Sequence, residues 1–382
     1  TKIDFPAIEF DSELVARIFE LERLRARLGV GSTPASTFRE LHALFQFLMS
    51  VVSARIEGNR TTVSEAASGL RAERAGAEVA TDQLKEIDNI QRAMSYIDGL
   101  PADQPLTHKL VRELHTMAVD GLVREGDPTP GHYRTVEVEI LRATHRPPGY
   151  HTLMPEMSDF IDFVNVDANP RSQLIHVAIA HHRFLWIHPF RNGNGRVSRL
   201  LSYFMLRRHG FVSPLGMRTV NPAAVFGSNR TQYLDALAVA DDLSDAGVIA
   251  WCEFFIQGMT VDLERVISLQ NLDFVTSKLI EPSIRKFHRA GGVSADEQDA
   301  LIRTAHLEIA KASDLADVFR GSPSQRSQRI RSLVDRGLLV PIEPGARKYR
   351  LSFGPNELTG FVVRQLDEIG YLPPMLRDDR AT

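Results

Sequence analysis

Apolar residues recur at helical spacing through most of residues 11–270, and this periodicity constrains the fold of the chain more than any other feature. Positions i, i+3, i+4 and i+7 are apolar in one stretch after another, which is the pattern of helices that bury one face. The pattern predicts helices over residues 11–29, 36–58, 64–73, 80–100, 107–122, 154–165, 172–188, 196–210, 229–240 and 246–270. We therefore expect a mainly α protein whose larger part is a helical bundle.

One segment interrupts the helices. PGHYRTVEVEILRATHRPPGYHT, residues 130–152, opens with Pro-Gly and alternates apolar residues at Val136, Val138 and Ile140. An alternation with a period of two is typical of a β-strand. The segment is predicted to form a short β-hairpin beside the helical bundle.

The last third of the chain has a different order of elements. Residues 297–352 predict a helix, a short turn, a second helix after Ser-Pro, and two strands around a Pro-Gly turn, which is the order of a winged helix-turn-helix. Only Asp335 and Glu343 are acidic between residues 326 and 350, against the basic residues Arg326, Arg329, Arg331, Arg336, Arg347, Lys348 and Arg350. Contacts to DNA phosphates would explain this excess. Winged helices also serve as dimerisation or protein-docking units, so both uses stay open.

The composition excludes several classes of protein. The 382 residues carry a formal net charge of −3, so no overall field draws the chain to nucleic acid or anionic lipid. The one cysteine, Cys252, rules out a disulfide framework and a multi-cysteine metal site. The N-terminus lacks the apolar stretch of a signal peptide, and the longest apolar run, residues 248–259, is shorter than the roughly 18 residues of a membrane helix. We expect a cytoplasmic protein without a membrane partner.

The stretch HPFRNGNGRVSR, residues 188–199, places glycines directly before a helix. Apolar residues at helical spacing from Val197 to Met205 predict that helix, and Gly193, Asn194 and Gly195 lie at its start. Glycines at this position let successive backbone N–H groups converge on an anion, and the helix dipole adds positive potential. The stretch therefore predicts an anion-binding loop.

A histidine and two arginines accompany this loop. Arg196 and Arg199 are three residues apart and share one face of the first helical turn. Cations oppose the dipole at a helix N-terminus, and binding of several phosphates would explain their presence there. His188, at the start of the loop, is suited to act as a general base near neutral pH. Each feature alone has an ordinary structural explanation, but together they predict phosphoryl or nucleotidyl transfer.

The same stretch resembles the signature of the Fic (filamentation induced by cAMP) family, HPFx[D/E]GNGRxxR. The usual activity of that family is AMPylation, in which AMP moves from ATP to a hydroxyl group of a target protein and pyrophosphate is released. The resemblance implies that His188 deprotonates a Ser, Thr or Tyr hydroxyl of the target. It also implies ATP as co-substrate, Mg²⁺ as cofactor, and a phosphate-binding role for Gly193, Asn194, Gly195, Arg196 and Arg199.

Other stretches resemble this family over about residues 35–260. GHYRTVEVEI resembles a flap hairpin that holds the target backbone by strand addition, with Tyr133, Arg134, Val136 and Val138 as its contact residues. SNRTQYL is expected to supply Asn229 and Tyr233 to the adenine pocket, although a packed helix accounts for both residues equally well.

SARIEGN, residues 53–59, resembles the inhibitory motif [S/T]xxxE[G/N] in the class of the family with an N-terminal inhibitory helix. Its Ser53, Glu57 and Gly58 match the three defined positions. A carboxylate of Glu57 paired with Arg199 would occupy the arginine needed for the γ-phosphate, so that ATP would bind wrongly or weakly. The alternative is that Glu57 is a solvated residue before a Gly-Asn helix end.

Asn192 departs from the family's pattern, in which Asp or Glu coordinates Mg²⁺. Asn offers a neutral carbonyl oxygen, which is a weaker ligand for this metal. Either Mg²⁺ binds through Asn192 and the phosphates, or the chain prefers another nucleotide or metal or is inactive.

Several other polar residues have structural explanations. His176, His181 and His182 lie on the predicted helix before His188, but their spacing is poor for a metal site and no acidic ligand follows. Core packing or hydrogen bonding accounts for them better. Glu86 and Asn89 belong to a stretch that resembles an early helix of the family, and they would also suit a buried polar scaffold.

These predictions divide the chain into residues 1–100 with the inhibitory helix (Ser53–Asn59), a catalytic core at 101–265, and a linker helix with a winged helix-turn-helix at 266–382. Two functions fit. One is a self-inhibited AMPylating enzyme, and the other is a nucleotide-sensing DNA-binding regulator whose core is weakly active or inactive. The expected partners are an unknown target protein, DNA at the winged helix, and a second copy of the chain, because many relatives dimerise.

Overall fold

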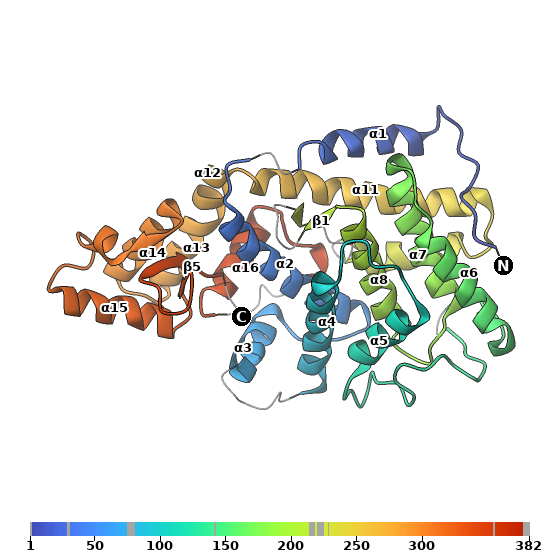
Figure 1. The fold of residues 1–382 in the computed structure, drawn as a ribbon, viewed down its shortest axis with the longest axis horizontal. Coiled ribbons are helices and arrows are strands. Elements are labelled where there is room, and N and C mark those ends of the chain that lie inside the picture. Colours follow the sequence, from blue (N-terminus) through green and yellow to red (C-terminus); the bar gives the residue numbers. More distant parts are fainter. Residues whose placement is uncertain are drawn as a thin grey trace.

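The computed structural model describes residues 2–28, 31–74, 81–140, 143–213, 218–219, 225–227, 229–353 and 356–376. Most of these residues are helical, so the mainly α fold class is confirmed (Figure 1). The helices of the larger part are α1 (Glu13–Arg25), α2 (Ala35–Ile56), α3 (Val63–Arg74), α4 (Asp82–Gly99), α5 (His108–Val119), α6 (Leu153–Asn165), α7 (Gln173–Ile187), α8 (Asn194–Arg208), α10 (Arg230–Val239) and α11 (Asp245–Leu269).

Side-chain caps begin many of these helices. Ser12, Thr81, Thr107 and Ser244 each accept a hydrogen bond from the backbone N–H three residues later. Such a bond satisfies one of the backbone donors that a helix start leaves without a partner. The caps explain why the helix starts lie so close to the positions that the sequence predicts.

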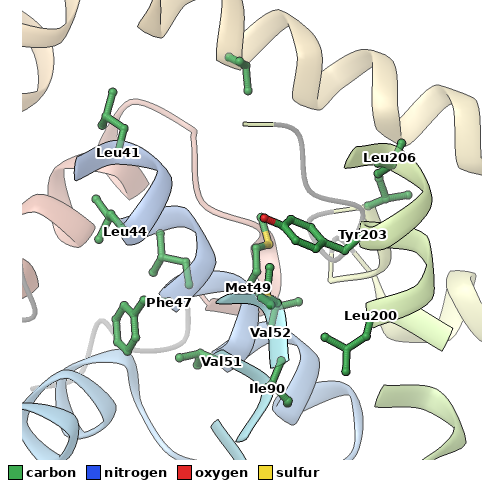
Figure 2. Close-up of a cluster of buried hydrophobic side chains, with 14 of the residues drawn as sticks. Leu41, Leu44, Phe47, Met49, Val51, Val52, Ile90, Leu200, Tyr203 and Leu206 are labelled. Atoms are coloured by element: carbon green, nitrogen blue, oxygen red, sulfur yellow. The ribbon is translucent and has the colours of Figure 1, made fainter. Parts of the chain in front are cut away.

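Helix α2 is part of the hydrophobic core. Its Val51 and Val52 pack near Ile90 of α4 and Leu200 of α8, and all four side chains are buried (Figure 2). Gln46 of α2 donates a hydrogen bond to the hydroxyl of Tyr203 on α8, at 3.0 Å. Because removal of a buried Leu or Ile side chain costs roughly 2–5 kcal/mol, the core holds α2 firmly against α8.

Helix α11 is the long apolar helix of the core. By length and composition alone it could cross a membrane, which is weak evidence, and no other described helix meets that test. It lies alongside α1 (Figure 1), and its Trp251, Cys252 and Phe255 are fully buried. The indole N–H of Trp251 donates to the carbonyl of Ala178 in α7, at 2.6 Å.

The predicted flap differs from the expected hairpin. No strand is assigned to the described residues between His132 and Pro148. The two arms of the segment are instead joined by one buried guanidinium, because Arg134 donates to the carbonyls of Val136, at 3.1 Å, and Pro148, at 2.5 Å. Side-chain bonds thus replace a backbone ladder in this segment.

Strands are few and short among the described residues. Val212–Ser213 (β1) pairs with Arg218–Thr219 (β2), and these strands were not predicted. The C-terminal part holds a three-stranded antiparallel sheet in the order β3-β5-β4, formed by Ala310–Lys311, Lys348–Leu351 and Leu339–Pro341. The hairpin of β4 and β5 was predicted, whereas β3 is too short to leave a periodic pattern.

The helices of the C-terminal part surround this sheet. They are α12 (Leu272–Phe274), a π-helical turn at Val275–Ile280, α13 (Glu281–Arg289), α14 (Ala295–Leu307), a 3₁₀ turn at Ala312–Leu315, α15 (Pro323–Asp335) and α16 (Thr359–Glu368). Helix α15 lies at the far end of the molecule (Figure 1), and only Ile330 and Leu333 of this helix are buried. Helix α16 returns to contact α3.

The C-terminal part is fastened to α2. Glu40 of α2 accepts hydrogen bonds from Arg350, from the hydroxyl of Ser352 at 3.1 Å, and from the backbone N–H of Phe353 at 3.2 Å. Near the other end of α2, Arg55 donates to the carbonyl of Met375, at 2.6 Å.

This arrangement corrects part of the predicted phosphate-binding surface. The guanidinium of Arg350 faces Glu40 of α2, and Arg336 pairs with Glu357, at 2.5 Å, and with Glu297, at 3.6 Å. Both arginines therefore serve contacts within the chain.

Candidate active site

His188 follows the last turn of α7 in a left-handed backbone conformation, with φ of 51°. Residues other than Gly rarely adopt this region, and such strain is concentrated at functional sites. Arg134 holds the turn in place, since its Nε donates to the His188 carbonyl at 2.8 Å and its backbone N–H donates to the Pro189 carbonyl at 2.9 Å. Arg134 is 3% exposed, so it stabilises this turn from inside and does not present its side chain as the predicted flap contact.

The His188 ring is arranged as a base. Its Nδ1 lies 3.4 Å from the carbonyl of Leu185, which can only accept, so the proton of the neutral ring resides on Nδ1 and Nε2 keeps its lone pair. Burial lowers the pKa of His188 to about 4, although the Leu185 carbonyl works in the opposite direction. The imidazole is consequently neutral at physiological pH.

Phe190 and Asn194 fix the loop that follows. Phe190 is fully buried and stacks on His115 of α5, with ring centroids 3.7 Å apart. The side chain of Asn194 accepts from the backbone N–H of Phe190 and donates to its carbonyl, each at 2.9 Å. Asn194 therefore closes the loop with its side chain and can offer only its backbone N–H to a phosphate.

Asn192 is held by both atoms of its side-chain amide. Its Oδ1 accepts from the N–H of Gly193, at 2.7 Å, and its Nδ2 donates to the carbonyl of Gly126, at 3.2 Å. Its backbone N–H donates to Asp127, at 2.9 Å, and its carbonyl accepts from His115, at 3.1 Å. The donor bond to Gly126 is one that a carboxylate at position 192 could not make.

The start of α8 leaves backbone N–H groups open where the anion-binding loop is predicted, and we call this segment the anion nest. Gly193 has φ of 78°, which a Gly adopts without cost. The first helical bond runs from Val197 to the Gly193 carbonyl, and the N–H groups of Asn194, Gly195 and Arg196 have no acceptor among the described residues. Three converging donors at a helix N-terminus are suited to bind phosphate oxygens.

The carboxylate of Glu57 lies at this nest. A methyl group on Gly195 would come within 2.2 Å of Glu57 Oε1 and within 3.3 Å of Arg199 Nη1. Gly195 is thus the residue that leaves room for an anion at the start of α8.

Arg199 is bound to α2 through two residues. Its Nη2 donates to Glu57 Oε1 at 2.5 Å and to the Ser53 carbonyl at 3.1 Å, and its Nε donates to Ser53 Oγ at 2.7 Å. Burial alone would raise the pKa of Glu57, but the guanidinium groups of Arg199, Arg196 and Arg230 together hold it below its usual range. Glu57 is therefore ionised and paired with Arg199, although 30% of its side chain remains exposed.

The backbone after α2 explains Gly58 and Asn59. Gly58 has φ of 99°, its N–H donates to the Arg55 carbonyl, and the N–H of Asn59 donates to the Ala54 carbonyl. This is a Schellman helix end, which places Glu57 on the last turn. The side chain of Asn59 donates to Glu86 of α4, at 2.9 Å.

Arg196 has a different environment from Arg199. It is 1% exposed, its Nη2 donates to the Glu125 carbonyl at 2.6 Å, and its Nη1 lies 3.4 Å from Glu86 Oε1. Burial raises the pKa of Glu86 to about 7 against the effect of Arg196. The side chain of Arg196 is engaged by the scaffold, so the site receives its backbone N–H and its charge.

The remaining predicted residues divide into inward and outward groups. Asn229 caps α10 by accepting from the N–H groups of Thr231 and Gln232, and Tyr233 is 2% exposed.

Tyr133 contacts the ring of Phe190, at a centroid distance of 5.3 Å. Val136 is 41% exposed and Val138 is half-buried, so they remain the outward side chains of the flap. Glu86 and Asn89 are both buried scaffold residues.

Residues of other elements also support the loop, and the sequence did not identify them. His115 accepts the N–H of Gly131 on Nδ1, at 2.9 Å, and so donates from Nε2 to the Asn192 carbonyl. Arg230 donates to the carbonyl of Ile56 at the end of α2, at 2.8 Å. Asp127, His115 and Arg230 lie outside any short motif, and no local signal identifies their partners.

Comparison with known proteins agrees with this geometry. Residues 105–206 match the model of the Fic/DOC family. The chain contains a Fic domain. The match lies within the predicted catalytic core of residues 101–265 and includes His188 and the start of α8.

Two relatives that this chain matches are named protein adenylyltransferase Fic. The one from Culex quinquefasciatus is 31% identical over 276 residues, covering 70% of this chain and 50% of the relative. The one from Drosophila grimshawi is 29% identical over 286 residues, covering 74% of this chain and 54% of the relative. The chain thus spans about half the length of the curated relatives it matches.

Solved structures share the fold. A Fic family protein from Desulfovibrio desulfuricans G20 superposes with a TM-score of 0.58 at 20% identity, covering 92% of this chain and 98% of that protein. Residues 134–508 of Fic-1 from C. elegans give a TM-score of 0.54 at 20% identity, covering 67% and 72%. The first comparison extends the likeness into the C-terminal part.

The Mg²⁺ ion that the family implies has one candidate protein ligand. Asn192 Oδ1 accepts a single hydrogen bond, so a second lone pair remains for a metal. No group of three or more His, Cys, Asp or Glu side chains suited to a metal occurs among the described residues. The site fits a hard cation that takes most of its ligands from phosphate oxygens and water.

Proposed function

We propose that the chain is a protein adenylyltransferase, which moves AMP from ATP to a Ser, Thr or Tyr hydroxyl of a target protein. The observation that carries this proposal is the neutral His188 beside a helix start with three open N–H groups. A base next to an anion nest is what nucleotidyl transfer to a hydroxyl requires. The relatives named protein adenylyltransferase Fic support the same reaction.

The proposed reaction uses few protein groups. Nε2 of His188 takes the proton of the target hydroxyl, whose oxygen then bonds to the α-phosphorus of ATP. The bond from that phosphorus to the bridging oxygen breaks, and pyrophosphate leaves with the electron pair. The N–H groups at the start of α8 and the guanidinium of Arg199 hold the phosphates, while bound Mg²⁺ would neutralise their charge and take Asn192 as its protein ligand.

The same proposal includes self-inhibition by Glu57. The Glu57 carboxylate lies at the start of α8, against Gly195, and engages Arg199. An anion in that position competes with the phosphates for the same donors. Because α2 is packed into the core, relief of inhibition requires rotation of the Glu57 side chain or movement of the last turn, and not departure of the helix.

Mass spectrometry of the purified protein incubated with ATP and Mg²⁺ tests the function. Glu57→Gly is expected to gain an AMP adduct on itself or on a partner, and Glu57→Gly with His188→Ala is expected to show none. An adduct that persists without His188 would contradict the proposed base. Absence of any adduct on Glu57→Gly across lysate proteins would contradict the proposed activity.

We also propose that the C-terminal part is a winged helix that binds DNA, which would make the protein a nucleotide-sensing DNA-binding regulator if its core is weakly active or inactive. Helix α15 supports this, since its outer face exposes Ser324, Gln328 and Arg331 at the far end of the molecule. Arg329 of the same helix forms an ion pair with Asp296, at 2.6 Å. A mobility shift with random duplex DNA at low salt should show binding that weakens as salt rises, and binding by Arg331→Glu as strong as by the unmodified chain would contradict it.

A further inference from the structure

The last turn of α2 is tied to the C-terminal segment, which we define as residues 371–376. Nη1 of Arg55 donates to the carbonyl of Met375 at 2.6 Å, a contact between residues 320 positions apart. Nη2 of the same guanidinium donates to the Thr61 carbonyl, at 3.2 Å. Arg55 belongs to the last turn of α2, two residues before Glu57. One side chain therefore joins the turn that carries Glu57 to the C-terminal segment.

The C-terminal segment is itself fixed in place. Helix α16 brings the chain back from the C-terminal part to α3 (Figure 1), and Leu372 and Leu376 after this helix are 2% and 1% exposed. The backbone N–H of Met375 donates to the Gly227 carbonyl, at 3.3 Å. Apolar burial and a backbone bond thus hold the carbonyl that Arg55 reaches.

Arg230 closes this set of contacts. It is the first residue of α10, three positions after Gly227, and its Nε donates to the Ile56 carbonyl at 2.8 Å. Bonds therefore run from α2 to Met375, from Met375 to Gly227, and through the start of α10 back to α2. We call Arg55, Met375, Gly227 and Arg230 the clamp. It restrains the last turn of α2 from two directions, because one arginine reaches out of the turn and the other reaches into it.

The clamp reaches Glu57 through the backbone. The N–H of Glu57 donates to the Ala54 carbonyl, and the N–H of Gly58 donates to the Arg55 carbonyl. The carboxylate of Glu57 can meet Arg199 only while this turn keeps its place. Bonds from a guanidinium are charge-assisted and stronger than neutral ones, so losing those of Arg55 would make movement of the turn easier.

We propose that the clamp sets the strength of self-inhibition, with Arg55 as a positioning residue that makes the hold of Glu57 on Arg199 depend on the C-terminal segment. The proposal rests on the self-inhibition by Glu57 proposed above. Displacement of the segment would raise the fraction of molecules that can bind ATP, and ATP binding would loosen the segment in return, because coupling between two sites is reciprocal.

Titration calorimetry of ATP with Mg²⁺ tests the clamp. Arg55→Met keeps a long side chain but removes its donors, and it should strengthen ATP binding about threefold to tenfold while Glu57 is present. In a Glu57→Gly background the same change should alter the affinity less than about twofold, because no carboxylate is left to position. A residue needed only for folding would not strengthen binding. Unchanged affinity in the chain that keeps Glu57, or an equal gain in both backgrounds, would overturn the proposal.

Leu376→Ala tests the clamp from the other side. Loss of this buried side chain should loosen the C-terminal segment and accelerate amide exchange at residues 54–59, on the turn that Arg55 holds. Leu333→Ala is the matched control, because Leu333 is also fully buried but lies on α15, at the far end of the molecule (Figure 1). Unchanged exchange at residues 54–59 in Leu376→Ala, or an equal acceleration in Leu333→Ala, would overturn the clamp.

These measurements separate the clamp from the proposed function. If Glu57→Gly binds ATP but transfers no AMP, the adenylyltransferase proposal fails while the four affinities still decide the clamp. If none of the four proteins binds ATP, amide exchange at residues 54–59 decides it. If Glu57→Gly transfers AMP but Arg55→Met leaves the affinity of the chain with Glu57 unchanged, the clamp fails and the proposed function stands.

Discussion

Nη2 of Arg199 lies 2.5 Å from Oε1 of Glu57, a contact between residues that are 142 positions apart in the chain. The pair lies beside Ser53 and Gly195, at the start of α8. Charge-assisted bonds of this kind are roughly twice as strong as neutral ones. The contact links the end of α2 directly to the donors that a nucleotide would need.

Ser53→Ala should weaken the hold of α2 on Arg199 without removing it. Nε of Arg199 loses its acceptor in this variant, while the ion pair with Glu57 remains. We expect ATP binding to strengthen by about threefold to tenfold, less than in Glu57→Gly, as measured by titration calorimetry. Ser50→Ala is the control, because the buried Ser50 hydroxyl donates to the Phe47 carbonyl of the same helix and has no contact with Arg199. An equal effect of both changes would contradict the specific role of Ser53.

Asn192→Asp should lower the stability of the protein and raise its affinity for Mg²⁺. The carboxylate cannot donate to the Gly126 carbonyl and would add a negative charge beside Asp127, so the free energy of unfolding should fall by about 1–3 kcal/mol. The Mg²⁺ concentration needed for half-maximal AMP transfer by Glu57→Gly should also fall, because carboxylates bind this ion better than amides. Thermal unfolding and a magnesium titration of activity measure the two effects. Unchanged stability would show that the amide bond to Gly126 contributes little.

His188 should stay neutral well below physiological pH. Its pKa near 4 means that the base form persists as pH falls through 6.5, where an ordinary imidazole would be half protonated. An NMR titration of the ring signal that disappears in His188→Ala should therefore show a midpoint below about 5. Glu57 raises this pKa by its charge, so Glu57→Gly should move the midpoint further down. A midpoint near 6.5 in both proteins would contradict the buried environment.

Glu86 should make folding less favourable as pH rises. Its pKa is raised to about 7 in the folded protein and is about 4.3 in an unfolded chain, so the stabilising effect of its proton is complete below pH 4 and is lost as pH passes 7. Glu86→Gln should remove this contribution, which is on the order of 3 kcal/mol. Urea unfolding of both proteins between pH 5 and 8 measures the difference in slope. Exposed Glu13→Gln is the control, and parallel curves for the unmodified chain and Glu86→Gln would rule out this role of Glu86.

Glu40→Ala should loosen the C-terminal part from α2. The variant removes the acceptor for Arg350, Ser352 and the Phe353 N–H, and it leaves a partly buried guanidinium without its carboxylate. We expect the free energy of unfolding to fall by about 3 kcal/mol and amide exchange to accelerate around residues 348–353. Hydrogen exchange followed by mass spectrometry measures this, with the exposed Glu20→Gln as control. Unchanged exchange in β5 would show that apolar packing alone holds the two parts together.

The part of the candidate site that lies within one short stretch of the chain was predictable from the sequence. His188, the glycines and Arg199 lie within twelve residues, and helical periodicity before and after them predicts the helix, the turn and the helix start that bring them together. The pairing of Glu57 with Arg199 came from a family resemblance. Periodicity predicts that α2 is a helix, but it contains no information about the element that its end approaches.

Local periodicity and cap residues in the sequence by themselves determined the helices, because those signals depend on neighbours a few positions away. Only the tertiary structure decided how each polar atom is used: Arg134 and Tyr233 face inward, Arg196 is engaged by Glu125 and Glu86, and both amide atoms of Asn192 are bonded. These partners come from distant segments, and a buried donor is satisfied by whichever acceptor the packing brings within reach. The same reason explains the absence of strands in the described flap residues, where the guanidinium of Arg134 takes carbonyls that a ladder would have used.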